Sequence, residues 1–191
     1  MKSLEILIKE HALILHALEC LTAARDKLEK GERPPKAFFE KAVEFFQNFA
    51  DKFHHFKEEY LMFGLLSQKK DGAHDGEIGT LRYQHERCRT FIGEIQKSIK
   101  GYSAGDEIAT TMLLENLSSY ISLLKLHIYI EDRIFFKMVE KALSENEDHA
   151  LFVQFKNEED RLGSDCFENS RKLVHKMGAL IANQDKRKDG F

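Results

Sequence analysis

Apolar residues recur at three- and four-residue steps along most of the 191-residue chain. The first run extends from Ser3 to about Lys30 and contains Leu4, Leu7, Ile8, Ile14, Leu15, Leu18 and Leu21. This is the period of an amphipathic helix. The same period returns from Pro35 to about Ser67, from Ile78 to Ile99, from Asp106 to about Leu143 and from Glu147 to about Asn183. The pattern therefore predicts four long helices and a fifth helical segment.

Glycine and proline separate the predicted helices. Gly31 stands before the only two prolines of the chain, residues 68–79 contain three glycines, and a glycine lies at each end of residues 101–105. Such residues are typical of turns. We therefore expect an all-α fold in which residues 1–143 form an up-down-up-down four-helix bundle. Residues 144–191 would add a C-terminal helix packed on the same domain.

Composition narrows the class of protein. The chain is 42% hydrophobic and 32% charged, and no apolar run approaches the ~20 residues that span a bilayer. Its net charge of −3 comes from interspersed acids and bases, without the basic stripe that nucleic-acid binding requires. Cys20, Cys88 and Cys166 are widely spaced with no CxxC pair, which argues against disulfides and thiolate zinc sites. Since no signal peptide is apparent, we expect a cytoplasmic protein without nucleic-acid or membrane partners.

Each of the first four predicted helices has a histidine on its apolar stripe, and two of these stripes also contain a glutamate one turn later. The six residues are His11, His54, Glu58, His85, His127 and Glu131. Burying such groups without partners would cost several kcal/mol. Two divalent cations would satisfy them, and a set of nitrogen and oxygen donors favours iron, with manganese or zinc possible. The stripes therefore predict a dimetal site inside the bundle.

A second histidine–glutamate pair, His55 and Glu59, directly follows the chosen pair on the second helix. Its stripe runs through the polar residues Asn48 and Lys52, which should face water. We therefore prefer the first pair as ligands and expect His55 to lie beside the site or in solvent. Glu59 and Asp132 lie about 100° around their helices from the chosen ligands. They could orient imidazoles, but we expect them to be solvated.

Four segments resemble the hemerythrin or HHE cation-binding family over roughly residues 1–143. They are IKEHALI (8–14), FHHFKEEYLMFGLL (53–66), GEIGTLRYQHERCR (76–89) and LHIYIEDRIFFKM (126–138). The resemblance implies that the same six residues bind two iron ions joined by an oxo or hydroxo bridge. It also implies that both glutamates bridge the irons.

Two positions depart from the oxygen-carrying members of that family. The carriers have a second histidine four residues after the one on the third helix, where this chain has Arg89. We therefore expect an open or water-filled coordination position on one iron. The carriers also take a bridging carboxylate from an aspartate five residues after the fourth-helix histidine. Asp132 occupies that position here and is a rival to Glu131.

The function expected from these residues is binding or sensing of dioxygen, nitric oxide or peroxide. One alternative is an oxidoreductase that turns over peroxide or nitric oxide. Because no redox-cofactor motif such as GxGxxG or CxxC is present, such an enzyme would need an electron-donor protein. Another alternative is an iron reservoir or regulatory module, whose stability depends on metal occupancy.

Overall fold

The computed structural model describes residues 1–69, 72–163 and 165–188. Across these ranges the chain is almost entirely helical and contains no strand, which confirms the predicted all-α class. Residues 70 and 71 of the predicted 68–79 connection, residue 164, and the final residues 189–191 lie outside the described residues. None of the described helices combines the length and hydropathy needed to cross a lipid bilayer.

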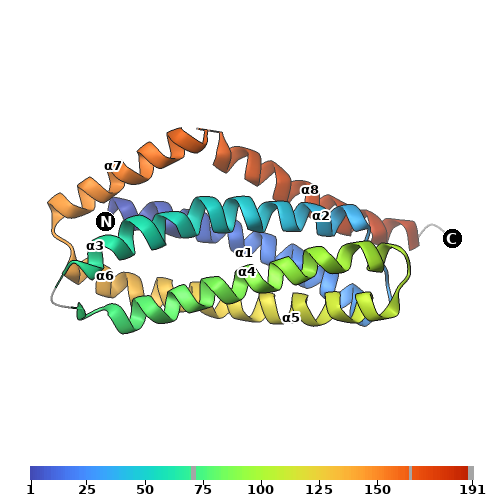
Figure 1. Cartoon of the computed structure of the whole chain (residues 1–191). Coiled ribbons are helices and arrows are strands. Elements are labelled where there is room, and N and C mark those ends of the chain that lie inside the picture. The colour runs from blue at the N-terminus through green and yellow to red at the C-terminus, as the bar shows by residue number, and fades with distance from the viewer. Residues whose placement is uncertain (70–71, 164, 189–191) are drawn as a thin grey trace.

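Long helices lie side by side along the molecule (Figure 1). Helix α1 (Lys2–Glu29) packs against α5 (Glu107–Ile130). Helix α4 (Asp75–Ser103) packs against both α5 and α2 (Lys36–Phe45). The Asp106 side chain accepts hydrogen bonds from two amides at the start of α5, as expected of an N-cap.

Two of the long helical stretches change to π-helix midway. After α2 the chain continues as the π-helical segments η1 (Phe46–His55) and η2 (Lys57–Met62) and then as α3 (Phe63–Ser67). After α5 it continues as the π-helical segment η4 (Glu131–Phe135) and α6 (Phe136–Ala142). Hydrogen bonds from residue i to i+5 widen the turn and are frequent at functional sites. The sequence pattern predicted continuous α-helices here.

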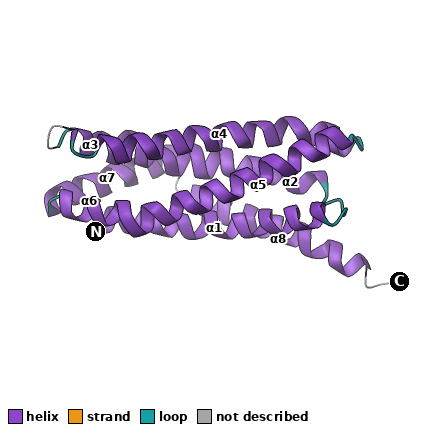
Figure 2. Cartoon of the chain, turned by 90° about the horizontal axis from the view of Figure 1, so that it is seen from below, coloured by secondary structure: helices purple, strands orange, loops and turns teal. Residues whose placement is uncertain are grey.

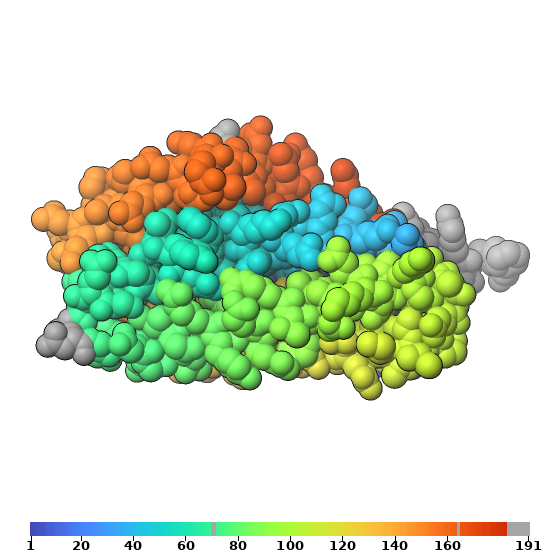
Figure 3. Space-filling model, viewed as in Figure 1, coloured from blue at the N-terminus to red at the C-terminus, as the bar shows by residue number. Residues whose placement is uncertain are grey.

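The C-terminal segment is two helices rather than the single one predicted from residues 147–183. Helix α7 (Glu145–Leu162) ends at Gly163, whose φ of 105° suits glycine, and α8 is Cys166–Lys188. Helix α7 packs against α1 and η2, whereas α8 packs against α1 and α2. Figure 3 shows these helices along one side of the molecule, and Figure 2 shows helices and loops but no strand in the described part of the chain.

The interior contains two apolar clusters. The larger cluster includes Leu13, Ile14, Leu18, Ala50, Phe53, Cys88, Ile92, Leu124 and Ile128. The smaller cluster includes Leu4, Leu7, Met62, Phe63, Ile78, Leu81, Phe135, Phe136, Leu151 and Phe155. Along each long stretch the chain passes from one cluster to the other within a few residues. Those few residues contain the buried polar side chains described next.

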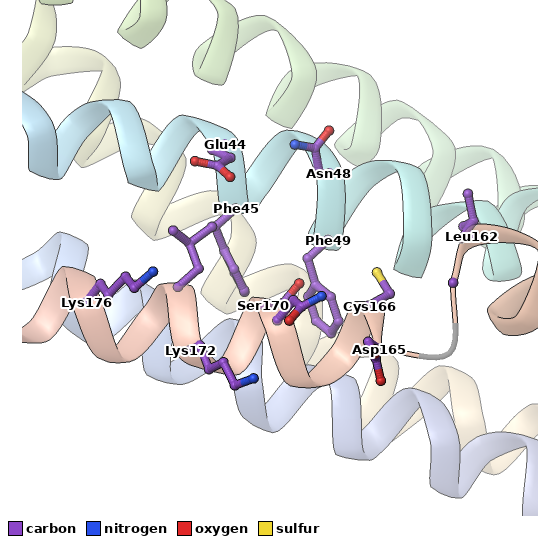
Figure 4. Close-up of a pocket in the computed structure, with 13 residues that line it drawn as sticks. Glu44, Phe45, Asn48, Phe49, Leu162, Asp165, Cys166, Ser170, Lys172 and Lys176 are labelled. Atoms are coloured by element: carbon purple, nitrogen blue, oxygen red, sulfur yellow. The ribbon is translucent and has the colours of Figure 1, made fainter.

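A cavity of about 480 Å³ lies between the second helical stretch and α8 (Figure 4). Its lining includes Phe45 and Phe49 on one side and Cys166, Ser170 and Lys172 on the other. None of the six predicted site residues lines it.

Candidate metal centre

All six predicted residues meet in one polar layer between the two apolar clusters. They come from α1, η1, η2, α4, α5 and η4, and each is at most 1% exposed. Phe136 stacks on the His11 ring at 5.6 Å between centroids, and Phe63 lies 6.2 Å from the His85 ring. Apolar side chains therefore enclose a set of donor groups on several sides.

The first donor group, called here the two-histidine cluster, consists of His11, His54, Glu58 and Glu131. One donor atom from each lies within 4.8 Å of the others. The Nε2 atom of His11 is 3.3 Å from Glu131 Oε2 and 3.9 Å from Glu58 Oε1. The Nε2 atom of His54 is 3.4 Å from Glu58 Oε1. These separations suit donors arranged around a common centre.

The second group, called the three-histidine cluster, consists of His55, Glu58, His85 and His127. The Nε2 atoms of His85 and His127 are 3.0 Å apart, and Glu58 Oε2 is 3.5 Å from His85 Nε2. Glu58 therefore belongs to both groups. Glu131 also reaches both, because its Oε2 atom is 3.1 Å from His127 Nε2 as well as close to His11.

His55 is the residue that the sequence interpretation missed. It is 2% exposed, and its ring stacks on that of His85 with centroids 3.8 Å apart. The expectation that it could lie in solvent is therefore wrong, and its position in the three-histidine cluster makes it a candidate ligand. The reason is the π-helix: an α-helix would place His55 about 100° away from His54, whereas the wider turn of η1 lets both neighbours face inward. The doubled histidine–glutamate spacing in the sequence was the available signal.

The outer nitrogen of each histidine faces an oxygen from a neighbouring side chain. The Nδ1 distances are 2.8 Å for His11 to Asp132, 2.9 Å for His54 to Glu10, 2.6 Å for His85 to Glu59, 2.9 Å for His127 to Gln84, and 3.5 Å for His55 to Asp51. An ionised carboxylate or an amide oxygen can only accept, so in a neutral imidazole an Nδ1 bonded to one of them donates and Nε2 keeps its lone pair. Such partners orient histidines that bind metals.

Two acids therefore differ from the solvated positions expected for them. Glu59 is 6% exposed and accepts from His85, so the expectation of solvation is wrong for it. Asp132 is partly exposed but binds the outer nitrogen of His11. Glu131, rather than Asp132, is the acid that faces the inside of the layer.

Arg89 turns away from the donor groups. Its guanidinium donates to Asp51, Glu59 and Glu86, each at 2.7 Å. Two of these acceptors are the oxygens that face the outer nitrogens of His55 and His85. This chain has Arg89 where a second histidine of α4 would stand, and His55 from η1 is instead the third histidine of the three-histidine cluster.

Burial keeps most of the histidines neutral. It lowers the pKa of His55 and holds the pKa values of His54 and His85 well below the usual range. Burial also lowers the pKa of His11, but the hydrogen bond to Asp132 and the nearby carboxylate of Glu131 outweigh it and raise that pKa to about 9. Neutral imidazoles are the form that binds metals.

The two glutamates shift in opposite directions. Burial, reinforced by the charge of Glu131, raises the pKa of Glu58 well above its usual value. Burial also raises the pKa of Glu131, but the nearby imidazoles of His127 and His11 outweigh it and hold that pKa at about 2. A cation between the two carboxylates would favour the ionised form of both.

Buried atoms without hydrogen-bond partners provide the test of whether a metal fits. In the described part of the chain they are His11 Nε2, both ring nitrogens of His55 and both carboxylate oxygens of Glu58 and of Glu131. Buried polar groups are normally satisfied. The facing Nε2 atoms of His85 and His127 would both present lone pairs, since their Nδ1 atoms donate outward. The donor atoms fit cations.

Comparison with known proteins agrees with this chemistry. Residues 2–139 match the family model described as the hemerythrin HHE cation-binding domain. Uncharacterised proteins of Mycobacterium bovis and of two Mycobacterium tuberculosis strains are each 24% identical over 157 residues, which is 82% of this chain. The chain spans 61% of the length of these relatives. No solved structure gives a significant match.

Proposed function

Because the chain belongs to the family of hemerythrin HHE cation-binding domains, we propose that it holds two iron ions and binds or senses dioxygen, nitric oxide or peroxide. The proposed ligands are the six residues predicted from the sequence together with His55. Glu58 and Glu131 would serve both ions. The proposal includes an up-down-up-down order of the four helical stretches and a cytoplasmic location.

The observation that supports this proposal best is the set of unpartnered donor atoms in one buried layer. A structural hydrogen-bond network would pair these atoms with one another. Instead, the outer nitrogens of four histidines are hydrogen-bonded, while His11 Nε2 and the carboxylate oxygens of Glu58 and Glu131 converge without hydrogen-bond partners. Metal binding explains both halves of this arrangement.

The donor types favour iron. The two clusters combine imidazoles with carboxylates and include no thiolate among the described residues. Such a set suits iron, manganese and zinc, whereas calcium and magnesium prefer oxygen ligands. When bound, reduced iron would supply the electrons with which dioxygen, nitric oxide or peroxide is bound or reduced.

The two clusters offer different numbers of histidines, which bears on where an external ligand binds. The two-histidine cluster has one imidazole fewer than its neighbour, so the external ligand is proposed to bind there. His11 of that cluster packs against Phe136, and apolar walls limit access of water to such a site. The three-histidine cluster lies beside a cleft of about 500 Å³ whose lining includes Asp51, Glu59 and Arg89. Asp51 and Glu59 also face the outer nitrogens of His55 and His85.

Spectra of the iron-loaded, reduced protein test the proposal when dioxygen, nitric oxide and peroxide are added separately and followed in time. A stable new absorption band with at least one of them supports binding or sensing. Repeated consumption of the added molecule with a supplied electron donor would replace this reading with the oxidoreductase alternative. Iron binding without a response to any of the three would replace it with the reservoir or regulatory alternative.

A further inference from the structure

Lys57 is a cation buried completely inside the protein. Its side chain is 0% exposed, and its ammonium group bonds to a carboxylate oxygen of Glu10 and lies 3.4 Å from Glu159 Oε1. It also lies 3.5 Å from the centroid of the Phe53 ring. Removing an ammonium group from water costs several kcal/mol unless partners compensate. These three contacts supply that compensation.

Glu10 connects this cation to the metal centre. It is 2% exposed, and while one of its oxygens binds Lys57, the other faces Nδ1 of His54 at 2.9 Å. The opposite nitrogen of His54 is directed at Glu58. Glu10 and Glu58 thus face opposite nitrogens of the His54 ring.

Through Glu159, Lys57 also contacts a helix outside the part of the chain that matches the family. It lies on α7, whereas the family match ends at residue 139. An unbroken series of polar contacts therefore runs from α7 through Lys57 and Glu10 to His54. The outer partners of the other histidines lie on the first four helical stretches.

We propose that Lys57 and Glu159 are positioning residues for His54, through which α7 adjusts the metal affinity of the two-histidine cluster. Lys57 holds Glu10 so that its free oxygen accepts from His54 Nδ1, leaving the Nε2 lone pair for the metal. Glu159 holds the Lys57 ammonium from the side of α7. The claim about metal affinity rests on the proposed function, whereas the claim about the His54 ring does not.

Helix α7 has other attachments that should survive a change at Glu159. The Asp148 carboxylate accepts from the backbone amides of Lys2 and Ser3 at 3.0 and 3.2 Å. Leu151 and Phe155 are buried in the smaller apolar cluster. Replacing Glu159 therefore tests its charge without releasing the helix.

The experiment compares Lys57→Met and Glu159→Gln with Lys156→Met as the matched control. Lys156 is the second cationic partner of Glu159, at 2.6 Å, and is exposed. Nitrogen-15 NMR of histidine side chains in the metal-free proteins reports which His54 nitrogen bears hydrogen. Competition with a chelator measures the affinity for iron(II), ion by ion.

The wild-type protein and the control should show His54 with hydrogen on Nδ1. Both test variants should shift His54 toward the Nε2 form, Lys57→Met by more than Glu159→Gln. Lys57→Met should also lower the affinity for one of the two iron(II) ions by about 10-fold, the lower end of the effect of removing outer partners of metal ligands. Glu159→Gln should lower the affinity for the same ion by a smaller factor.

An unchanged His54 signal in Glu159→Gln overturns the proposal, and this variant decides alone if Lys57→Met does not fold. An equal loss of affinity for both ions also overturns it, as does the same loss of affinity in Lys156→Met. If the wild-type protein binds no metal, the proposed function fails, and the NMR comparison still decides whether Lys57 and Glu159 position His54.

Discussion

Replacing Glu58 by methionine should change the stability of the metal-free and metal-loaded protein in opposite directions. Without metal, both carboxylate oxygens are buried and lack hydrogen-bond partners. Methionine has a similar length and favours helix, and it removes the cost of burying the carboxyl group. We expect the metal-free Glu58→Met variant to be more stable than the wild-type protein by about 1–3 kcal/mol.

The magnitude converts into a measurable thermal shift. For a chain of this size, 1 kcal/mol corresponds to roughly 2–4 °C in Tm, so metal-free Glu58→Met should melt roughly 2–12 °C higher. Metal at 1,000 times its Kd stabilises the wild-type protein by about 4 kcal/mol. The variant should lose most of that gain, because Glu58 contributes to both clusters.

Thermal unfolding followed by circular dichroism would measure both effects, once with chelator and once with two equivalents of iron(II) under anaerobic conditions. Glu44→Met is the control, since Glu44 is an exposed acid of α2; it should change stability by less than about 0.5 kcal/mol in either state. A metal-free Glu58→Met protein that is less stable than wild type, with an unchanged response to iron, would refute the assignment of Glu58 as a shared ligand.

Three further predictions follow from the same geometry. His55→Ala should reduce bound metal from two ions to about one per chain, measured by elemental analysis, because an inner donor is lost; exposed His16 offers a control, and an unchanged ratio would exclude His55. Because the pKa of His11 is about 9 when the protein is folded and 6.5 for an unperturbed histidine, its stabilisation is complete below pH 6.5 and is lost as the pH rises through 9. The metal-free protein should therefore lose up to about 3 kcal/mol between these values in denaturant titrations, and His11→Gln should lose less. Arg89→Met should lower the affinity for the ion of the three-histidine cluster by about 10-fold in chelator competition. The same loss of affinity in Arg87→Met would indicate a nonspecific charge effect.

The helical period was enough to predict the class of fold and the meeting of six polar residues. Residues three or four apart share a helix face. His11, His85 and His127 stand in register with apolar residues of their helices, so they are buried where those apolar residues are buried. Burial of all six at 1% exposure or less is consistent with that rule. Their role as metal ligands remains a prediction.

The helical period misplaces residues where the backbone departs from α-helical geometry. The inward position of His55 depends on the π-helical turn of η1, and a pattern assessed at 100° per residue assigns His55 to another face. The break at Gly163 depends on a positive φ, which glycine permits but does not require. In both cases tertiary packing selects the local conformation.

The outer partners of the histidines were also beyond the sequence pattern. Glu10 and His54 are 44 residues apart in the chain, and Glu59 and His85 are 26 apart. Helix periodicity says which face a side chain occupies, but it does not say which residue lies opposite on a neighbouring helix. The same holds for Lys57, because a lysine is rarely buried completely without partners and its partners Glu10 and Glu159 lie on other helices.

The most direct test of the central claim is the metal content of the protein purified without chelator, measured by elemental analysis against protein concentration. We predict close to two transition-metal ions per chain, with iron the main metal, because the buried donors form two groups that share Glu58. A ratio near zero after purification and after incubation with iron(II) would contradict it.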